Sequence, residues 1–138
     1  MKKTLMLFAA ALALLVTTAA SAQTIHEEAD IPFSFIINGA TLPAGEYSVK
    51  SADVTGKVLL ISDLNSHTNN LILANSCRSG KVATKDKLVF HRYGDRYFLN
   101  QIWVAGNDAG HELPTSRREK EVAGDFSMQE VVLVAAKR

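Results

Sequence analysis

The chain has 138 residues, of which 47% are hydrophobic and 21% are charged, and its 15 basic and 14 acidic side chains give a formal net charge of +1. A chain of this length is expected to form one domain with a core of its own. Its near-neutral charge provides no basic surface for neutralising phosphate groups, so we expect no nucleic-acid partner.

The first 22 residues have the pattern of a secretory signal peptide. Lys2 and Lys3 precede an apolar run over residues 5–16, and the small residues at 20–22 match an A-x-A cleavage site. The apolar run is shorter than the roughly 20 residues of a membrane-spanning helix. We therefore expect cleavage before Gln23, a mature domain over residues 23–138 in the periplasm or outside the cell, and no stable membrane insertion after cleavage.

Alternating apolar residues predict strands in the first half of the mature chain. Residues 31–37 place four large side chains on one face of an extended segment, with Pro32 at its start or at a sheet edge. Asn38-Gly39 is typical of a type I′ hairpin turn that pairs Phe35 with Leu42. Residues 46–50 resume the alternation, and we expect Tyr47 and Val49 to point inward.

Two short apolar runs follow, over residues 58–61 and 71–73. Both are too short for independent helices, and their continuous hydrophobicity predicts central strands that are covered on both faces. The polar segments over residues 75–86 and 105–113 are interpreted as connections. Cys77, the only cysteine, has no partner for an internal disulfide and is predicted to be a small, partly buried hydrophobe. The alternatives are a reactive thiol or one that links a dimer.

The clearest element is a hairpin over residues 88–103, with Gly94-Asp95 as a two-residue type II′ loop. Its expected register places Tyr93 opposite Arg96, and Arg92 opposite Tyr97. One face then carries Leu88, Phe90, Tyr97 and Leu99, and the other carries Val89, His91, Tyr93, Phe98 and Ile102. Because both faces are apolar, we expect both to be covered.

The C-terminal part predicts one short surface helix and a closing strand. Ser116 and Glu119 have the spacing of a capping box, and Gly124 suits the helix end. The β-branched run over residues 131–134 favours a strand. The predicted fold is all-β: an antiparallel sandwich or small barrel of about seven to eight strands with one short surface helix.

Three segments of the chain together resemble a family of small uncharacterised secreted bacterial proteins. They are Ile-Pro-Phe-Ser-Phe at 31–35 through Leu-Pro-Ala-Gly-Glu-Tyr at 42–47, Leu-Val-Phe-His-Arg-Tyr-Gly-Asp-Arg-Tyr-Phe at 88–98, and residues 113–118. The resemblance spans most of the mature chain. It implies an exported protein and brings no activity, ligand or site residue with it.

The strongest polar cluster lies at the tip of the predicted hairpin. Arginines that donate and tyrosines that stack would suit an anion or a carbohydrate, which predicts a binding site. Its residues are Arg92, Tyr93, Asp95, Arg96 and Tyr97. The alternative is a purely structural hairpin, in which Arg92 packs against Tyr97 and His91 pairs with Phe98.

No sequence pattern indicates catalysis. The four histidines are scattered without metal-ligand spacing, and no serine or cysteine nucleophile motif is present. We therefore expect no enzyme activity, no metal and no cofactor, and predict a binding or structural module whose partner is an extracellular or envelope protein or a glycan. Two alternatives stay open: a hydrophobic-ligand carrier with an internal cavity, and a small hydrolase or metal-dependent enzyme if His91, Asp95 and His111 converge.

Overall fold

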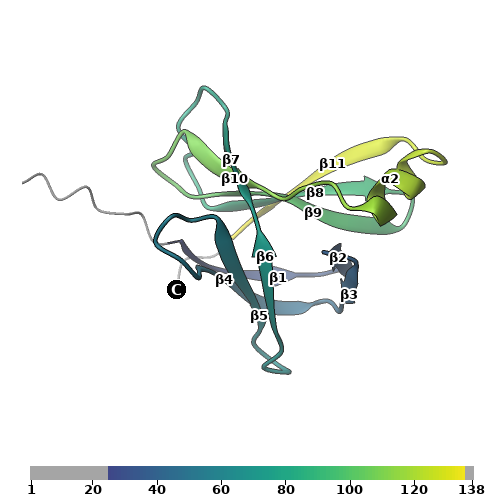
Figure 1. The fold of residues 1–138 in the computed structure, drawn as a ribbon, viewed down its shortest axis with the longest axis horizontal. Helices are drawn as coiled ribbons and strands as arrows, with labels where there is room; N and C mark the ends of the chain where they lie inside the picture. The colour runs from purple at the N-terminus through teal and green to yellow at the C-terminus, as the bar shows by residue number, and fades with distance from the viewer. Residues whose placement is uncertain (1–24, 136–138) are drawn as a thin grey trace, which may run out of the picture.

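The computed structural model describes residues 25–135, so the predicted signal peptide lies outside the described residues. These residues form eleven strands and one short helix (Figure 1). The strands are β1 (His26–Ile31), β2 (Phe35–Ile37), β3 (Ala40–Leu42), β4 (Gly45–Ser51), β5 (Val58–Asp63), β6 (Asn69–Leu73), β7 (Asn75–Arg78), β8 (Lys87–Tyr93), β9 (Arg96–Trp103), β10 (Ala109–Glu112) and β11 (Met128–Val134), and the helix is α2 (Arg117–Ala123). No helix in the described part of the chain has the length and apolar character to cross a membrane.

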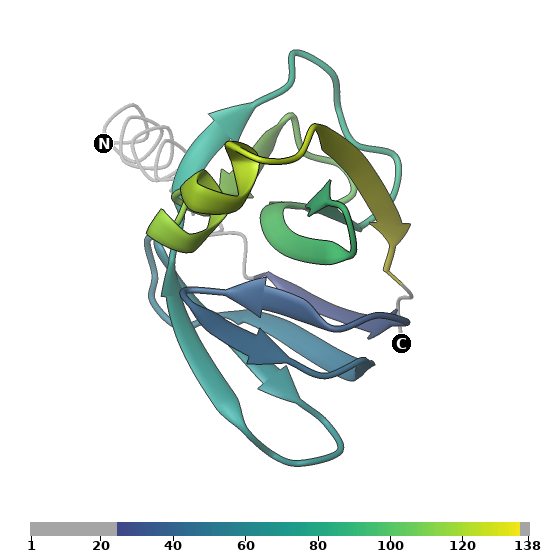
Figure 2. The same ribbon diagram turned by 90° about the vertical axis from the view of Figure 1, so that its right-hand side faces the viewer.

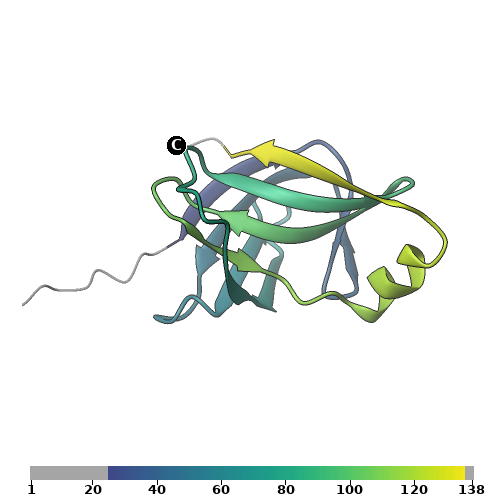
Figure 3. The same cartoon turned by 90° about the horizontal axis from the view of Figure 1, so that it is seen from above.

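The strands form two sheets that face each other, which confirms the predicted all-β sandwich (Figures 1 and 2). The first sheet has the order β1-β4-β5-β6. The second has the order β11-β8-β9-β10-β7, and the β2–β3 hairpin joins it by a parallel contact between Ile36 and Phe98. Seen from above, the second sheet extends along the molecule, with α2 at one end (Figure 3).

Large side chains from both sheets fill the space between them. Tyr47, Phe35 and Phe90 are fully buried, and their rings pack edge to face, with centroids 5.0 Å apart for Phe35 and Tyr47 and 5.7 Å apart for Phe35 and Phe90. The Tyr47 hydroxyl donates a hydrogen bond of 2.6 Å to the carbonyl oxygen of Pro43. Burial beside Asp63 raises the pKa of Tyr47 to about 12. The inward positions predicted for Tyr47 and Val49 are thus confirmed.

The predicted strand over residues 31–37 is broken in the structure. Its first part, β1, belongs to the first sheet, and β2 begins at Phe35 in the second sheet. Pro32 lies in the break, because it cannot donate to a ladder. The hairpin that follows is confirmed: Phe35 pairs with Leu42, and Asn38 and Gly39 have the positive φ values of 46° and 79° that a type I′ turn requires.

The β8–β9 hairpin confirms the predicted register at its tip and corrects it further along. Tyr93 lies opposite Arg96 and Arg92 opposite Tyr97, but Val89 then pairs with Gln101, which leaves Asn100 as an extra residue in a β-bulge. A bulge reverses the alternation that follows it. Ile102 therefore points into the core between the sheets, and not to the face predicted for it.

The apolar run over residues 71–73 is not a central strand. It belongs to β6, the last strand of the first sheet, and its Leu71 and Leu73 side chains are exposed. The run over residues 58–61 does lie inside the sheet, as β5. Only its inward residues Leu59 and Ile61 are fully buried, since nothing in the described chain stacks on the outer face of this sheet.

Two segments interpreted as polar connections contain strands. β7 follows β6 after the single residue Ala74, and the chain passes from one sheet to the other there (Figure 1). In the second sheet β7 pairs with β10, with Cys77 opposite Gly110. Both strands are short and polar, and β7 is the edge strand of its sheet, so no apolar alternation indicated them in the sequence. These two strands, together with β1 as a strand separate from β2, account for the excess over the predicted strand count.

The Ser116 half of the predicted capping box is confirmed at the start of α2, whereas the Glu119 carboxylate bonds to the second sheet instead of the Ser116 amide. The Ser116 hydroxyl oxygen accepts a hydrogen bond of 3.1 Å from the Glu119 amide. Val122 is the buried apolar residue of the helix and packs on Ile36, Tyr93 and Phe98 of the second sheet. The helix therefore covers one end of the outer face of that sheet.

Candidate functional site

The structure separates the five residues predicted to form a binding site at the hairpin tip. Tyr93 is buried, and its hydroxyl donates a hydrogen bond of 3.1 Å to Oε1 of Glu119. Burial and this bond raise the pKa of Tyr93. Asp95 and Arg96 are exposed at the turn. Tyr93 thus fastens α2 to the second sheet through its hydrogen bond to Glu119.

Arg92 and Tyr97 form a stack on the other face of the hairpin. The Arg92 guanidinium lies 5.4 Å from the centroid of the Tyr97 ring, and its Nε donates a bond of 2.7 Å to the carbonyl oxygen of Gly94. Tyr97 in turn stacks on Phe33 at 3.8 Å between centroids. This is the structural pairing that the alternative interpretation predicted. The five residues are therefore divided between two faces, and a joint binding role for them stays a prediction.

Glu119 is a site residue that the sequence pattern did not single out beyond its capping role. Its carboxylate is buried, and Oε1 accepts from Tyr93 and lies 3.0 Å from Nδ1 of His91. The three side chains join α2 to the second sheet. A signal for this contact existed in the alternation of β8, which places His91 and Tyr93 on one face.

His91, Asp95 and His111 do not converge. His91 lies opposite Phe98 on the face that α2 covers, whereas His111 lies opposite Ile102 on the face that points to the core. Their partners Phe98 and Ile102 lie four positions apart along β9, which corresponds to about 13 Å. The described residues also include no group of three or more His, Cys, Asp or Glu side chains that could hold a metal ion.

His111 and Cys77 have other environments. His111 contacts Gly56 in the β4–β5 connection, and burial lowers its pKa, against a smaller opposing effect of a hydrogen bond to the Gly56 backbone. Cys77 is partly buried, as predicted, and burial together with the nearby Glu112 raises the pKa of its thiol. A raised pKa disfavours the reactive thiolate.

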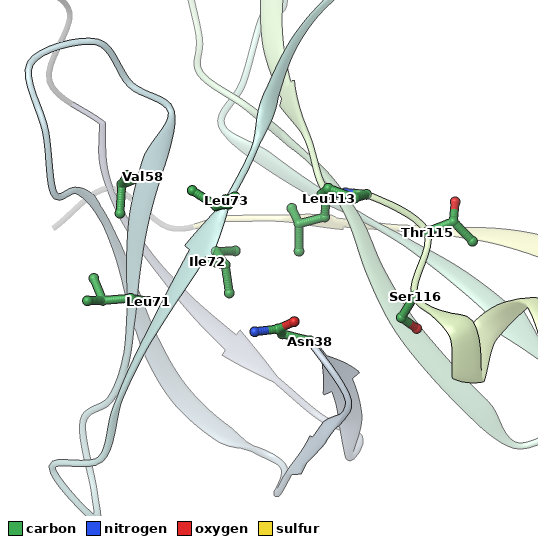
Figure 4. Close-up of a pocket in the computed structure, with 9 residues that line it drawn as sticks. Asn38, Val58, Leu71, Ile72, Leu73, Leu113, Thr115 and Ser116 are labelled. Atoms are coloured by element: carbon green, nitrogen blue, oxygen red, sulfur yellow. The ribbon is translucent and has the colours of Figure 1, made fainter.

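An apolar groove of about 280 Å³ runs along β6 (Figure 4). One wall is the strand itself, and the other is the segment that connects β10 to α2. In Figure 4 Leu113 and Asn38 lie beside Ile72, at the open side of the strand. The groove is lined by Asn38, Val58, Leu71, Ile72, Leu73, Leu113, Pro114, Thr115 and Ser116.

The main chain of β6 presents unused hydrogen-bonding groups to this groove. The Ala74 amide donates to the carbonyl oxygen of Lys57 at 2.8 Å, and in an antiparallel pair the bonded positions alternate. Ile72 and Asn70 therefore bond to β5, while the N–H and C=O groups of Leu71 and Leu73 point to the free edge. The side chains of these two leucines are 62% and 68% exposed.

Compared with known protein families, with curated proteins and with solved structures, the chain has no match in any of the three. The resemblance to uncharacterised secreted proteins stays a prediction.

Proposed function

We propose that the protein is a non-catalytic binding module, exported from the cytoplasm, that takes an extended segment of a partner polypeptide onto the free edge of β6. The observation that carries the proposal is the edge itself: Leu71 and Leu73 each direct an N–H and a C=O group into an apolar groove. An extended backbone satisfies such a row of groups by adding one strand to the sheet.

The side chains around the edge support a peptide as the occupant. An added strand places alternate side chains on the two faces of the sheet. Those on the outer face would cover Leu71 and Leu73, and those on the inner face would contact Leu113 and Pro114. The Asn38 amide adds one donor group and one acceptor at the end of the groove.

Two other edge strands, β1 and β11, differ from β6 in ways that favour β6. By the same alternation, the main-chain groups of His26, Glu28 and Asp30 point to the free edge of β1. Charged residues on an edge strand oppose the addition of another strand. β11 is an edge strand with exposed Val132 and Val134, and it carries Glu130 beside them. The groove wall formed by Leu113 and Pro114 stands beside β6, so a strand added to that edge would gain apolar contacts on both of its faces.

The proposal is tested with peptides selected from a random dodecapeptide library on the immobilised protein. Leu73→Pro removes one edge N–H and leaves the bonds between β6 and β5 in place, because the Leu73 amide points away from β5. Val132→Pro is the matched control on the β11 edge. We expect Leu73→Pro to weaken peptide binding at least tenfold and Val132→Pro to leave it unchanged, as measured by fluorescence anisotropy.

Three results would contradict the proposal. They are equal binding by wild type and Leu73→Pro, loss of binding only in Val132→Pro, and sedimentation data showing that a second copy of the chain occupies the β6 edge. Circular dichroism of both variants shows whether each is folded. If Leu73→Pro does not fold, Leu73→Lys replaces it, with Val132→Lys as its control.

A hydrophobic-ligand carrier would need a cavity between the sheets. The rings of Tyr47, Phe35 and Phe90 pack against one another in that space. The apolar groove instead lies outside the core, beside a strand edge, where a peptide backbone gains hydrogen bonds that a lipid does not.

A further inference from the structure

The groove along β6 continues beyond Ser116. A second hollow shares Asn38 and Ser116 with the groove and extends to Arg118. A third hollow shares Arg118 with the second and extends to Arg96 and Phe126. One path of connected hollows therefore leads from the β6 edge, along α2, to the tip of the β8–β9 hairpin.

The chemistry of this path changes from apolar to charged. The groove along β6 contains no charged side chain, whereas the two further hollows contain three arginines, Glu121 and Asp125. Arg117 lies 3.3 Å from Glu121, so these two charges compensate each other. Arg96, Arg118 and Asp125 remain, and together they carry one net positive charge.

The two remaining arginines are not engaged with acidic groups. Nη1 of Arg118 donates a hydrogen bond of 3.3 Å to the hydroxyl of Thr41. Within the described part of the chain, no carboxylate oxygen lies within 4.0 Å of either Arg96 or Arg118. A single additional carboxylate would neutralise the second and third hollows taken together.

From these charges we infer that the partner segment carries a carboxylate just beyond its apolar part, and that this group binds between Arg96 and Arg118. The inference rests on the proposed strand addition at β6. Helix α2, which lines the third hollow from Arg118 to Val122, has seven residues and is about 10 Å long. An extended chain covers that distance in about three residues.

The test uses the same random dodecapeptide library. Selected sequences are compared between wild type, the double variant Arg96→Gln/Arg118→Gln, and the control Arg78→Gln, an exposed arginine outside the path. We expect wild type and the control to enrich Asp or Glu about three positions after an alternating apolar stretch. We expect the double variant to keep the apolar pattern and lose the acidic preference.

Affinities of one enriched peptide and its Asp→Asn version complete the test. On wild type the acidic peptide should bind about two- to fivefold more tightly, within the range of exposed charge pairs, and on the double variant the two should bind equally. An apolar pattern without acidic enrichment, or a preference that persists in the double variant, would overturn the inference and leave the proposed function standing. Binding unaffected by Leu73→Pro, or a library without binders, would count against both.

Discussion

Replacing Gly110 by alanine should destabilise the second sheet. A Cβ atom at this position would lie 2.7 Å from Cδ2 and Cε3 of Trp103 and 2.9 Å from its Cζ3. Carbon atoms normally approach to about 3.5 Å, so the indole would have to move by about 1 Å. Its Nε1 donates a 3.1 Å bond to Oε1 of Gln101, and Lys87 lies over the ring, which leaves little room for that movement.

The magnitude follows from two opposing effects. Overpacking of this kind typically costs about 1–3 kcal/mol. Exchanging glycine for alanine stabilises by about 0.4–1 kcal/mol, because it restricts the unfolded chain. We therefore expect Gly110→Ala to lower the free energy of unfolding by about 1–2 kcal/mol.

Urea denaturation followed by fluorescence is the appropriate assay, because Trp103 is the only tryptophan of the chain. Gly124→Ala is the control: its backbone is helical and its new Cβ would meet Glu121 at an ordinary 3.5 Å, so we expect no loss of stability. In a Trp103→Leu background, followed by circular dichroism, the cost of Gly110→Ala should shrink. Equal stability of Gly110→Ala and wild type would refute the packing of Trp103 on Gly110.

Two further predictions concern buried polar groups. Glu119→Ala removes the acceptor for the Tyr93 hydroxyl and should lower the free energy of unfolding by about 1–3 kcal/mol, as measured by thermal or urea unfolding. Glu121→Ala breaks only an exposed pair and should cost less than about 1 kcal/mol. Similar losses in both variants would contradict the buried hydrogen bond between Tyr93 and Glu119. Because burial lowers the pKa of His111 below its ordinary value of 6.5, the unfolded chain takes up a proton at higher pH than the folded one, so stability should fall as the pH drops below about 6.5. His111→Gln should show a shallower fall between pH 7 and pH 5 in urea titrations, and an unchanged slope would contradict burial of this imidazole.

Local signals in the sequence were sufficient for hairpins and for the helix start. Asn38-Gly39 and Gly94-Asp95 encode turns through the backbone angles their glycines permit, and these turns fix the register of neighbouring residues. The capping box at Ser116 depends on residues three apart in the chain. In these cases the interacting groups are near in sequence, so the local sequence pattern is enough to predict the turns and the helix start.

The position of a strand within a sheet was not readable from the sequence. The runs over residues 58–61 and 71–73 are similar in composition, yet one lies inside the first sheet and the other at its edge. Edge position depends on which strands pair across the whole chain. The bulge at Asn100 was also missed, because an extra residue leaves no mark in an alternating pattern until the register is known.

The candidate site was missed for the same reason. Exposure of Leu71 and Leu73 follows from the sheet order, and the opposing groove wall comes from Leu113 and Pro114, some forty residues later. Arg96, predicted as part of a binding site at the hairpin tip, does line the charged end of the connected hollows. The sequence therefore pointed to Arg96, but it contained no signal for the connected hollows that Arg96 lines.

Amide hydrogen exchange measured by NMR, with and without a selected peptide, tests the central claim most directly. Binding by strand addition predicts that the amides of Leu71 and Leu73 exchange rapidly in the free protein and become protected in the complex, while the edge amides of β1 and β11 do not change. Unchanged exchange at Leu71 and Leu73 in a saturated complex, or new protection confined to β1 or β11, would contradict it.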